Sequence, residues 1–207
     1  MSDAAVFLDR DGTLVEPRHY PSRPEDLHLF PGVAGELRSI QRDGYKLVVI
    51  TNQSGLARGL FSELDLARMH QHLATTLREQ GVDLDGIYYC PHHVDGVVPH
   101  LAIECDCRKP RPGLLRRAAL DEDIDLERSW FIGDILDDVE AGRRAGCRTI
   151  LVDLGTESPP TSDLRTPEFV ARDTVHALRI VRGAALETDY RPARWREPAL
   201  GGVHGSY

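Results

Sequence analysis

The chain alternates short apolar runs with amphipathic segments, and this pattern predicts its secondary structure. Runs such as AVFL at 5–8 and LVVI at 47–50 are rich in aliphatic, β-branched and aromatic side chains, which favour buried strands. Further strands are expected at 87–89, 130–132, 149–152 and 169–171. Apolar residues at helical spacing predict helices at 33–42, after Ser62 through Leu77, at 113–120, at 137–145 and at 174–182.

The helix boundaries carry local signals of their own. Ser62 is a favoured N-cap residue, Asp65 three positions later supports a helix start there, and Gly146 suits the position after a helix end. Strands that alternate with helices predict an α/β fold, a three-layer Rossmann-like parallel sheet of five to six strands with helices on both faces. We expect one domain over residues 1–182 and an irregular or partly disordered tail at 183–207.

Composition narrows the functional classes. The 207 residues are 41% hydrophobic and 28% charged, as in ordinary globular proteins. A formal net charge of −8 argues against binding nucleic acid, and no apolar run approaches the roughly 20 residues of a membrane span. The start MSDAAVFLD lacks the basic and apolar regions of a signal peptide, so we expect a cytoplasmic protein with reduced cysteines. We also expect a monomer.

Polar side chains follow three of the expected strands. Asp9 and Asp11 come after the first strand, Thr51 after the second, and Asp134 after the fourth, with Asp138 close behind. Because the carboxyl ends of parallel strands meet at one edge of a sheet, we expect these side chains to share a crevice. The carboxylates would suit Mg²⁺. Each feature also has a plainer explanation, as an acidic turn, a helix cap or a first-turn carboxylate.

A crevice of this kind would suit phosphoryl transfer. A cation, hydrogen-bond donors from Thr51 and Asn52, and the ammonium of Lys109 would all stabilise negative oxygens. Lys109 is one of only two lysines among 25 basic residues, and it offers a compact charge that arginine does not reproduce. One carboxylate could then form an acyl phosphate, while a second protonates the leaving group and later activates water.

Four ordered motifs resemble those of the haloacid dehalogenase (HAD) superfamily of aspartate-nucleophile phosphatases: DRDGT at 9–13, TNQSG at 51–55, Lys109, and GDILDD at 133–138. The resemblance implies that Asp9 is the nucleophile and a Mg²⁺ ligand. It implies that Asp11 is the general acid and base and binds Mg²⁺ through its backbone carbonyl. The other implied site residues are Thr51 and Lys109 for the phosphoryl group, Asp134 for Mg²⁺, and Asp138 in support.

A second cluster lies in the stretch CPHHVDGVVPHLAIECDCRKP, which begins at Cys90. Three sulfurs and one imidazole would make a closed tetrahedral set for structural zinc: Cys90, His92, Cys105 and Cys107. The alternatives are reduced free thiols or a redox pair of Cys105 and Cys107, and spacing does not exclude His93 or His100 as ligands. Cys147, in an apolar turn, is expected to be a buried structural thiol.

The run GIYYCPHH…CDCRKP, with LDRDGT and TNQSGLARG, resembles a narrower family, the D-glycero-D-manno-heptose 1,7-bisphosphate phosphatases and their relatives that act on histidinol phosphate. The resemblance covers roughly residues 5–152. It implies zinc on the four cluster residues, so that the insert at 90–107 directs Arg108 and Lys109 into the site. The implied substrate contacts are Arg10, Tyr20, Asn52, Gln53, Ser54, Arg58 and Arg108.

One departure from the family pattern concerns the substrate. The family places a lysine after the metal-binding aspartate, where this chain has Ile135, and residues 18–20 also depart in part. Either Arg58, Arg108 or Arg111 compensates, or the substrate differs. The leading hypothesis is removal of the C7 phosphate of the heptose bisphosphate. The alternatives are a phosphatase acting on histidinol phosphate or another monophosphate, a phosphomutase and, from a different class, a zinc-stabilised binding module.

Overall fold

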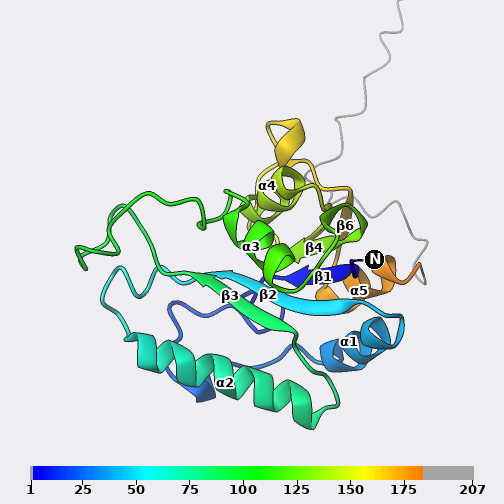
Figure 1. Ribbon diagram of the computed structural model, residues 1–207, viewed down its shortest axis with the longest axis horizontal. Helices are drawn as coiled ribbons and strands as arrows, with labels where there is room; N and C mark the ends of the chain where they lie inside the picture. The colour runs from blue at the N-terminus through cyan, green and yellow to red at the C-terminus, as the bar shows by residue number, and fades with distance from the viewer. Residues whose placement is uncertain (1, 184–207) are drawn as a thin grey trace, which may run out of the picture.

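A sheet of six parallel strands forms the centre of the computed structural model, which describes residues 2–183. The strands are β1 (Ala5–Leu8), β2 (Lys46–Asn52), β3 (Gly86–Cys90), β4 (Trp130–Gly133), β5 (Arg148–Val152) and β6 (Phe169–Ala171). Their order across the sheet is β3-β2-β1-β4-β5-β6 (Figure 1). The predicted parallel sheet of five to six strands is therefore confirmed.

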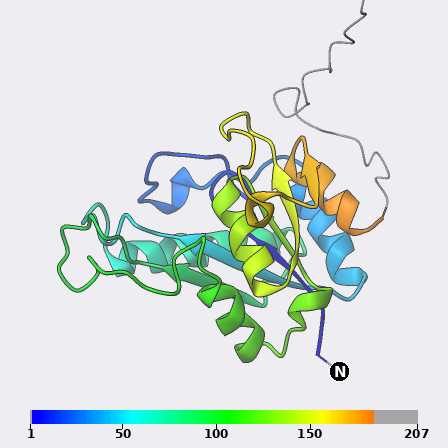
Figure 2. The same cartoon turned by 90° about the horizontal axis from the view of Figure 1, so that it is seen from above.

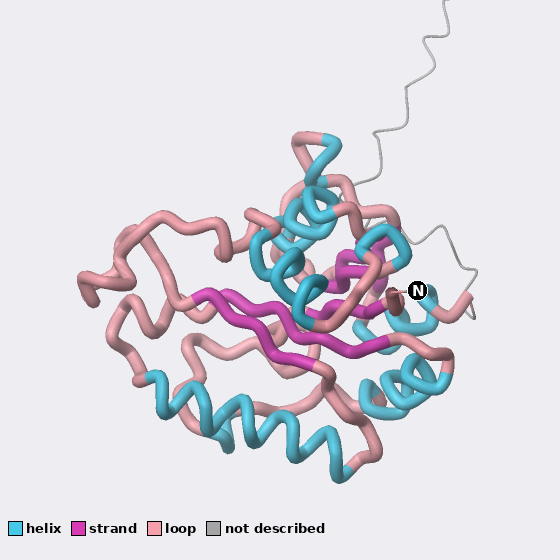
Figure 3. Tube along the Cα trace, viewed as in Figure 1, coloured by secondary structure: helices cyan, strands magenta, loops and turns pink. Residues whose placement is uncertain are grey.

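Five α-helices cover the two faces of this sheet and complete the three layers (Figures 1 and 3). They are α1 (Val33–Arg42), α2 (Glu63–Glu79), α3 (Gly113–Asp121), α4 (Leu136–Ala145) and α5 (Thr174–Val181). Helices α1, α2 and α5 pack on one face, and α3 and α4 pack on the other. Three short 3₁₀ helices, which the apolar pattern did not predict, lie at Pro24–Asp26, Leu126–Arg128 and Asp163–Arg165.

The strands are apolar throughout because both sides of the sheet are covered. In β1, Val6 and Leu8 pack towards α1, α2 and α5, whereas Ala5 and Phe7 pack towards α3 and α4. All four side chains are fully buried. Burying a large apolar side chain contributes about 1.5–3 kcal/mol, so the continuous run that marks β1 in the sequence also anchors it in the core.

The predicted helix boundaries at Ser62 and Gly146 are present. The Ser62 hydroxyl accepts a hydrogen bond from the Asp65 N–H at 3.2 Å, and the Asp65 carboxylate accepts one from the Ser62 N–H at 3.0 Å. Gly146 ends α4 with a φ of 95°, a left-handed conformation that favours glycine.

The direction of the chain across the sheet reverses at β1, and this reversal locates the site. From β1 the chain moves outward through β2 to β3, and β4 then returns to the other side of β1. The carboxyl ends of β1 and β4 therefore lie side by side, which is the usual ligand position in such sheets. The loops at 53–61 and 91–112 project beyond this edge (Figures 1 and 2), and two backbone N–H groups, of Val97 and Val98, join them by donating to the Ala57 carbonyl.

Two further sequence expectations concern the C-terminal tail and membrane-spanning helices. The predicted tail at 183–207 lies, apart from Gly183, outside the described residues. Within residues 2–183, no helix is both long enough and apolar enough to span a bilayer.

Candidate active site

The turn after β1 places Asp9 at the carboxyl edge of the sheet. The Asp9 N–H donates to the Ile132 carbonyl at 2.9 Å, so pairing with β4 continues one residue past the strand. Gly12 follows with a φ of 85°, and a Cβ there would lie 2.2 Å from Asp134 Oδ2. Glycine is thus required twice at this position, by the backbone conformation and by the carboxylate opposite it.

Three carboxylates gather at this edge. Oxygen atoms of Asp9, Asp134 and Asp138 all lie within 4.8 Å of one another. Asp134 directly follows β4, and Asp138, in the first turn of α4, accepts a hydrogen bond from the Ile135 N–H at 3.3 Å. A Cβ at Gly133 would lie 2.2 Å from Asp138 Oδ2, so this glycine leaves room for the carboxylate.

Lys109 reaches the carboxylates from the loop that precedes α3. Its Nζ lies 2.6 Å from Asp9 Oδ1 and 2.7 Å from Asp138 Oδ1, and it donates to the Ile50 carbonyl at 3.0 Å. Burial alone would lower the pKa of Lys109, but the charges of Asp138 and Asp9 outweigh it and raise that pKa. Lys109 is therefore a buried ammonium that stays charged at neutral pH.

One ammonium does not balance three carboxylates. Burial is the largest cause that raises the pKa of Asp9, to about 7, with the charges of Asp138 and Asp11 adding to it and that of Lys109 opposing it. Burial and the neighbouring Asp9 and Asp138 raise the pKa of Asp134 to about 8. A cluster that holds protons this firmly has the excess negative charge that a divalent cation would offset.

The end of β2 holds Lys109 in place from the opposite side. Asn52 Nδ2 donates to the Lys109 carbonyl at 3.2 Å, and the Lys109 N–H donates back to Asn52 Oδ1 at 3.1 Å. The sequence predicted β2 to end at Ile50, but the strand continues to Asn52 because Thr51 and Asn52 still pair with β3. Thr51 and Asn52 are therefore presented by a strand and not by a loop.

Asp11 does not join the three clustered carboxylates through its side chain. Its carboxylate instead accepts hydrogen bonds from Arg10 and Gln53. Arg10 and Gln53, which the resemblance assigns to the substrate, are both buried; they line a cavity, and their hydrogen bonds go to Asp11, to each other and, for Gln53, to Thr51.

Two cavities flank the carboxylates. One of about 250 Å³ is lined by Lys109, Arg108 and Arg111, with His93 and Asp137. The other, of about 230 Å³, has both polar and aromatic lining residues, which include Asp11, Arg18, Tyr20, Asn52, Gln53 and Ser54. The predicted substrate contacts that line these cavities are Arg10, Tyr20, Asn52, Gln53, Ser54 and Arg108. Arg58 instead contacts His93, with Nη2 3.1 Å from Nε2 of the ring.

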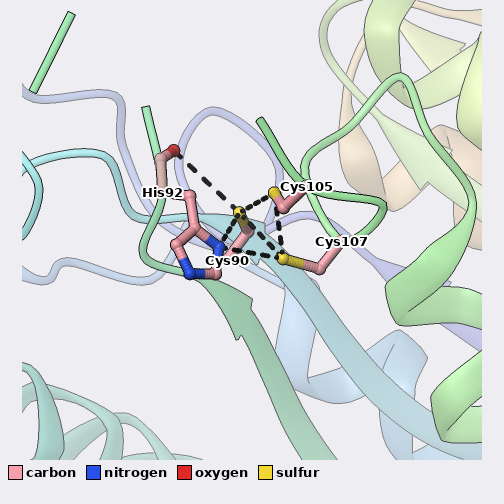
Figure 4. A group of neighbouring side chains, drawn as sticks. All are labelled: Cys90, His92, Cys105 and Cys107. Atoms are coloured by element: carbon pink, nitrogen blue, oxygen red, sulfur yellow. Dashed lines mark hydrogen bonds between the residues drawn. The ribbon is translucent and has the colours of Figure 1, made fainter. Parts of the chain in front are cut away.

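The four predicted zinc ligands converge at the base of the 91–112 loop (Figure 4). The Cys107 sulfur lies 3.2 Å from the sulfurs of both Cys90 and Cys105, and 3.3 Å from Nδ1 of His92. Sulfurs in a tetrahedral zinc site with bonds of about 2.3 Å are about 3.7 Å apart, so the group needs little adjustment to hold the ion. The hydrogen bond between Cys107 and Cys90 is the main cause that lowers the pKa of Cys107 to about 5. Contacts with Cys107 and burial raise the pKa of Cys90 and of Cys105, so of these three thiols Cys107 is the one held as a thiolate.

Two other residues considered with the zinc cluster, His93 and Cys147, lie apart from it. His93 contacts Arg58 and is not one of the four clustered ligands. Cys147 is buried in the apolar core beside α3 and α4, and burial raises its pKa to about 12, as expected of an unreactive structural thiol.

Comparison with known proteins identifies the family. Residues 106–177 match the HAD-hydrolase-like family model. A D-glycero-beta-D-manno-heptose-1,7-bisphosphate 7-phosphatase of Photorhabdus laumondii is 43% identical over 152 residues, which are 73% of this chain and 81% of the relative. The enzyme of the same name from Pasteurella multocida is 39% identical over 181 residues, 86% of this chain and 97% of the relative. The chain belongs to the heptose-1,7-bisphosphate 7-phosphatase family.

A solved structure extends this likeness to the fold. The D,D-heptose 1,7-bisphosphate phosphatase of B. bronchiseptica, complexed with magnesium and phosphate, superimposes with a TM-score of 0.74 at 30% identity, covering 88% of this chain and 99% of the other. As a member of the heptose-1,7-bisphosphate 7-phosphatase family, the chain is a phosphoric monoester hydrolase with the HAD fold, as predicted.

The sequence analysis gave some residues around the site of this phosphatase family member no part in binding the substrate. Asp137 and His93 line the first cavity and Arg18 lines the second. Asp137 lies within the GDILDD motif and His93 within the CPHH run, so their place in these motifs was the available signal. Which cavity each of these side chains lines depends on how separate loops meet in the fold, and the spacing of the motifs along the chain does not reveal that.

Proposed function

We propose that the protein is a Mg²⁺-dependent phosphatase that removes the C7 phosphate of D-glycero-D-manno-heptose 1,7-bisphosphate through an aspartyl phosphate on Asp9. The arrangement of Asp9, Lys109, Asp134 and Asp138 carries the proposal. It combines a carboxylate nucleophile, a fixed ammonium and an electron-rich cluster for a cation at one edge of the sheet. Phosphoryl transfer depends chiefly on such positioning and charge stabilisation.

In this mechanism the Asp9 carboxylate attacks phosphorus while Lys109 and Thr51 hold the phosphoryl oxygens. As the bond from phosphorus to the sugar oxygen breaks, Asp11 gives its proton to that oxygen. Asp11 then takes a proton from a water molecule that attacks the aspartyl phosphate, and inorganic phosphate leaves. Lys109 suits its part because it is buried, charged and held on three sides.

Asp9, Asp134 and the backbone carbonyl of Asp11 would hold Mg²⁺, with Asp138 in support. The close approach of the Asp9, Asp134 and Asp138 oxygens favours this assignment, since clustered oxygen ligands of this kind are what Mg²⁺ prefers. The ion, when bound, would neutralise charge on the phosphoryl group and on the carboxylates that hold it.

We also propose that Cys90, His92, Cys105 and Cys107 bind one structural zinc ion. Four ligands from the two ends of one loop would fill a tetrahedral site and leave no open position. The ion would thereby brace the loop up to Cys107, which directly precedes Arg108 and Lys109. Zinc in this reading positions cations and takes no part in the reaction.

The second phosphate of the substrate would occupy the cavity beside Lys109. This chain has Ile135 at the position where the family pattern has lysine, yet Arg108 and Arg111 both line that cavity. Among residues 2–183, the Arg111 guanidinium contacts an exposed Glu104 carboxylate and the Cys105 carbonyl, so moving it onto a substrate oxygen would cost little. Arg58, the third arginine considered, contacts His93 instead.

The proposal needs no partner subunit, because every residue assigned to the site belongs to one chain. We propose a monomer that acts in the cytoplasm on a phosphorylated metabolite, since a sugar bisphosphate is too highly charged to cross a membrane unaided.

The deciding experiment measures phosphate release with Mg²⁺ from both anomers of the heptose bisphosphate, from histidinol phosphate and from several sugar monophosphates. We expect kcat/KM for the bisphosphate to exceed the rest by tens-fold, a difference of about 2 kcal/mol or more. Preference for a monophosphate would show that Ile135 marks a different substrate. A stable phosphoenzyme that requires a bisphosphate activator would indicate a phosphomutase instead.

A further inference from the structure

The cavity beside Lys109 has acidic as well as basic lining residues. Its cations are Arg108, Lys109 and Arg111, and its carboxylates are Glu104 and Asp137. A phosphate monoester carries about −1.5 to −2 charges at neutral pH. A carboxylate on the wall of a cavity that takes such a group therefore opposes binding, unless a cation next to it offsets its charge.

Asp137 is paired with an arginine that comes from another part of the chain. Arg165 is the last residue of the short 3₁₀ helix Asp163–Arg165, and its Nη1 lies 2.9 Å from Asp137 Oδ1 and 3.0 Å from Glu140 Oε2. The Arg165 side chain is 29% exposed and that of Asp137 is 36% exposed. A pair at this depth contributes little to folding stability, so its charge balance is the property to explain.

The two carboxylates that Arg165 contacts depend on it unequally. Glu140 also pairs with Arg144, whose Nη2 lies 2.7 Å from Glu140 Oε1. For Asp137, Arg165 is the only cation within ion-pair distance in the part of the chain that the structure describes. Loss of the Arg165 charge would thus leave Glu140 with a partner and Asp137 without one.

The segment at 153–168, between β5 and β6, brings Arg165 to the start of α4. The same segment contacts α4 a second time, because Glu157 Oε2 accepts a hydrogen bond from the Leu136 N–H at 3.0 Å. The cations that line the cavity all belong to the loop at 91–112 instead. Arg165 therefore offsets the charge of Asp137 without engaging the cations that would meet a phosphate.

We propose that Arg165 is a positioning residue that holds and neutralises Asp137 at the wall of this cavity, and that it thereby sets the affinity for the second phosphate of the substrate. The inference rests on the proposed function and deepens it. The second phosphate does not react, so it is bound alike before and during the reaction. Arg165 consequently acts on KM and leaves kcat unchanged.

The test compares two substrates that differ by one phosphate, with Mg²⁺ present throughout. They are the heptose 1,7-bisphosphate and the heptose 7-phosphate, which keeps the reacting group and lacks the other. We expect Arg165→Met to raise KM for the bisphosphate about tenfold, because an unpaired carboxylate then faces the second phosphate. KM for the 7-phosphate, and kcat for both, should change less than about twofold.

Four further variants make the outcome readable. Arg165→Lys keeps the charge and should restore KM to within about threefold of wild type. Adding Asp137→Asn to Arg165→Met removes the unpaired charge and should restore it equally. Arg179→Met breaks a surface pair with Glu36 at 2.8 Å and should change neither substrate. A melting curve confirms folding, and Arg165→Gln takes the place of Arg165→Met if the latter does not fold.

The outcomes separate the inference from the proposed function. Wild type that releases no phosphate from the bisphosphate, or that prefers the 7-phosphate, would overturn the proposed function and the inference with it. In wild type that prefers the bisphosphate, the inference alone would be overturned by an unchanged KM in Arg165→Met, by an equal rise in KM for both substrates, or by a loss of kcat on both, which a merely structural role would produce. A rise in KM that persists when Asp137→Asn is added would overturn it as well.

Discussion

At the scale of single residues, charge balance dominates this site. Lys109 pairs directly with Asp9 and Asp138, and its charge opposes the rise in the pKa of Asp134 without outweighing burial and the two neighbouring carboxylates. In the proposed mechanism the site thus supplies the three parts that phosphoryl transfer requires: a nucleophile, a fixed cation and a place for a second cation.

The nucleophile assignment predicts the behaviour of Asp9→Asn. The amide keeps the size of the carboxylate but cannot form the aspartyl phosphate, so kcat should fall by at least about 1,000-fold while the protein stays folded. Phosphate release and a melting curve on the same sample check both parts. A variant that still turns over substrate would remove Asp9 from its role.

The crowded carboxylates predict an unusual pH dependence of stability. Folding raises the pKa of Asp9 to about 7 and that of Asp134 to about 8, so the folded state binds more protons than the unfolded state above about pH 4. Stability without Mg²⁺ should therefore fall as pH rises from about 4 to 8, and Mg²⁺ should restore more stability at pH 8 than at pH 6.

Asp134→Asn tests this directly. Without Mg²⁺ it should melt at a higher temperature than wild type at pH 8 and respond less to added Mg²⁺, while activity is lost. Asp83→Asn, which alters an exposed pair with Arg78, is the matched control and should leave the pH profile unchanged. The measurement uses Mg²⁺-free buffer without chelator, so that the cysteine cluster is not disturbed. A flat profile in wild type would contradict the charge argument.

At the scale of elements, the sequence predicted strands and helices better than loops. The apolar runs located all six strands because both faces of the sheet are covered, whereas the end of β2 was placed too early because Thr51 and Asn52 are polar although they still pair with β3. The motifs located Asp9, Thr51 and Asp134 at strand ends. That Arg10 and Gln53 turn to Asp11 depends on contacts between the segments that follow β1 and β2, which spacing along the chain does not reveal.

If the loop at 91–112 is held by zinc, loss of zinc should lower activity. Cys107→Ser should abolish stoichiometric zinc and lower kcat/KM by about 10- to 100-fold, because Lys109 follows two residues later and its position depends on the brace. Hydrogen exchange should quicken in the loop before it does in the sheet. Cys147→Ala, which alters the buried cysteine outside the cluster, should keep one equivalent of zinc. Wild-type protein purified without chelator and found free of zinc would refute the loop assignment.

At the scale of the whole molecule, the topology explains why the site lies where it does. The side-by-side ends of β1 and β4 bring Asp9 and Asp134 together, although they are far apart in the sequence. Loops from both halves of the sheet then reach over the same edge, and the other edge carries no comparable group of carboxylates among the residues described.

The domain boundary predicts that a chain ending at Gly183 remains an enzyme. All residues assigned to the site lie between Asp9 and Asp138, and α5, the last described helix, is intact in such a chain. We expect its kcat and KM to match those of the full chain within about twofold, since distant changes seldom affect a site they do not touch. A large loss of kcat at unchanged melting temperature would place part of the site in the last 24 residues.

Gly133 offers the site no functional group, yet Asp138 occupies the space that a side chain there would fill. One added methyl would push that carboxylate aside and leave the ammonium of Lys109 with a single anion. In a map of all single substitutions, position 133 would score like the catalytic residues around it. The sensitivity of position 133 would come from the absence of a Cβ atom there and from no chemical group of its own.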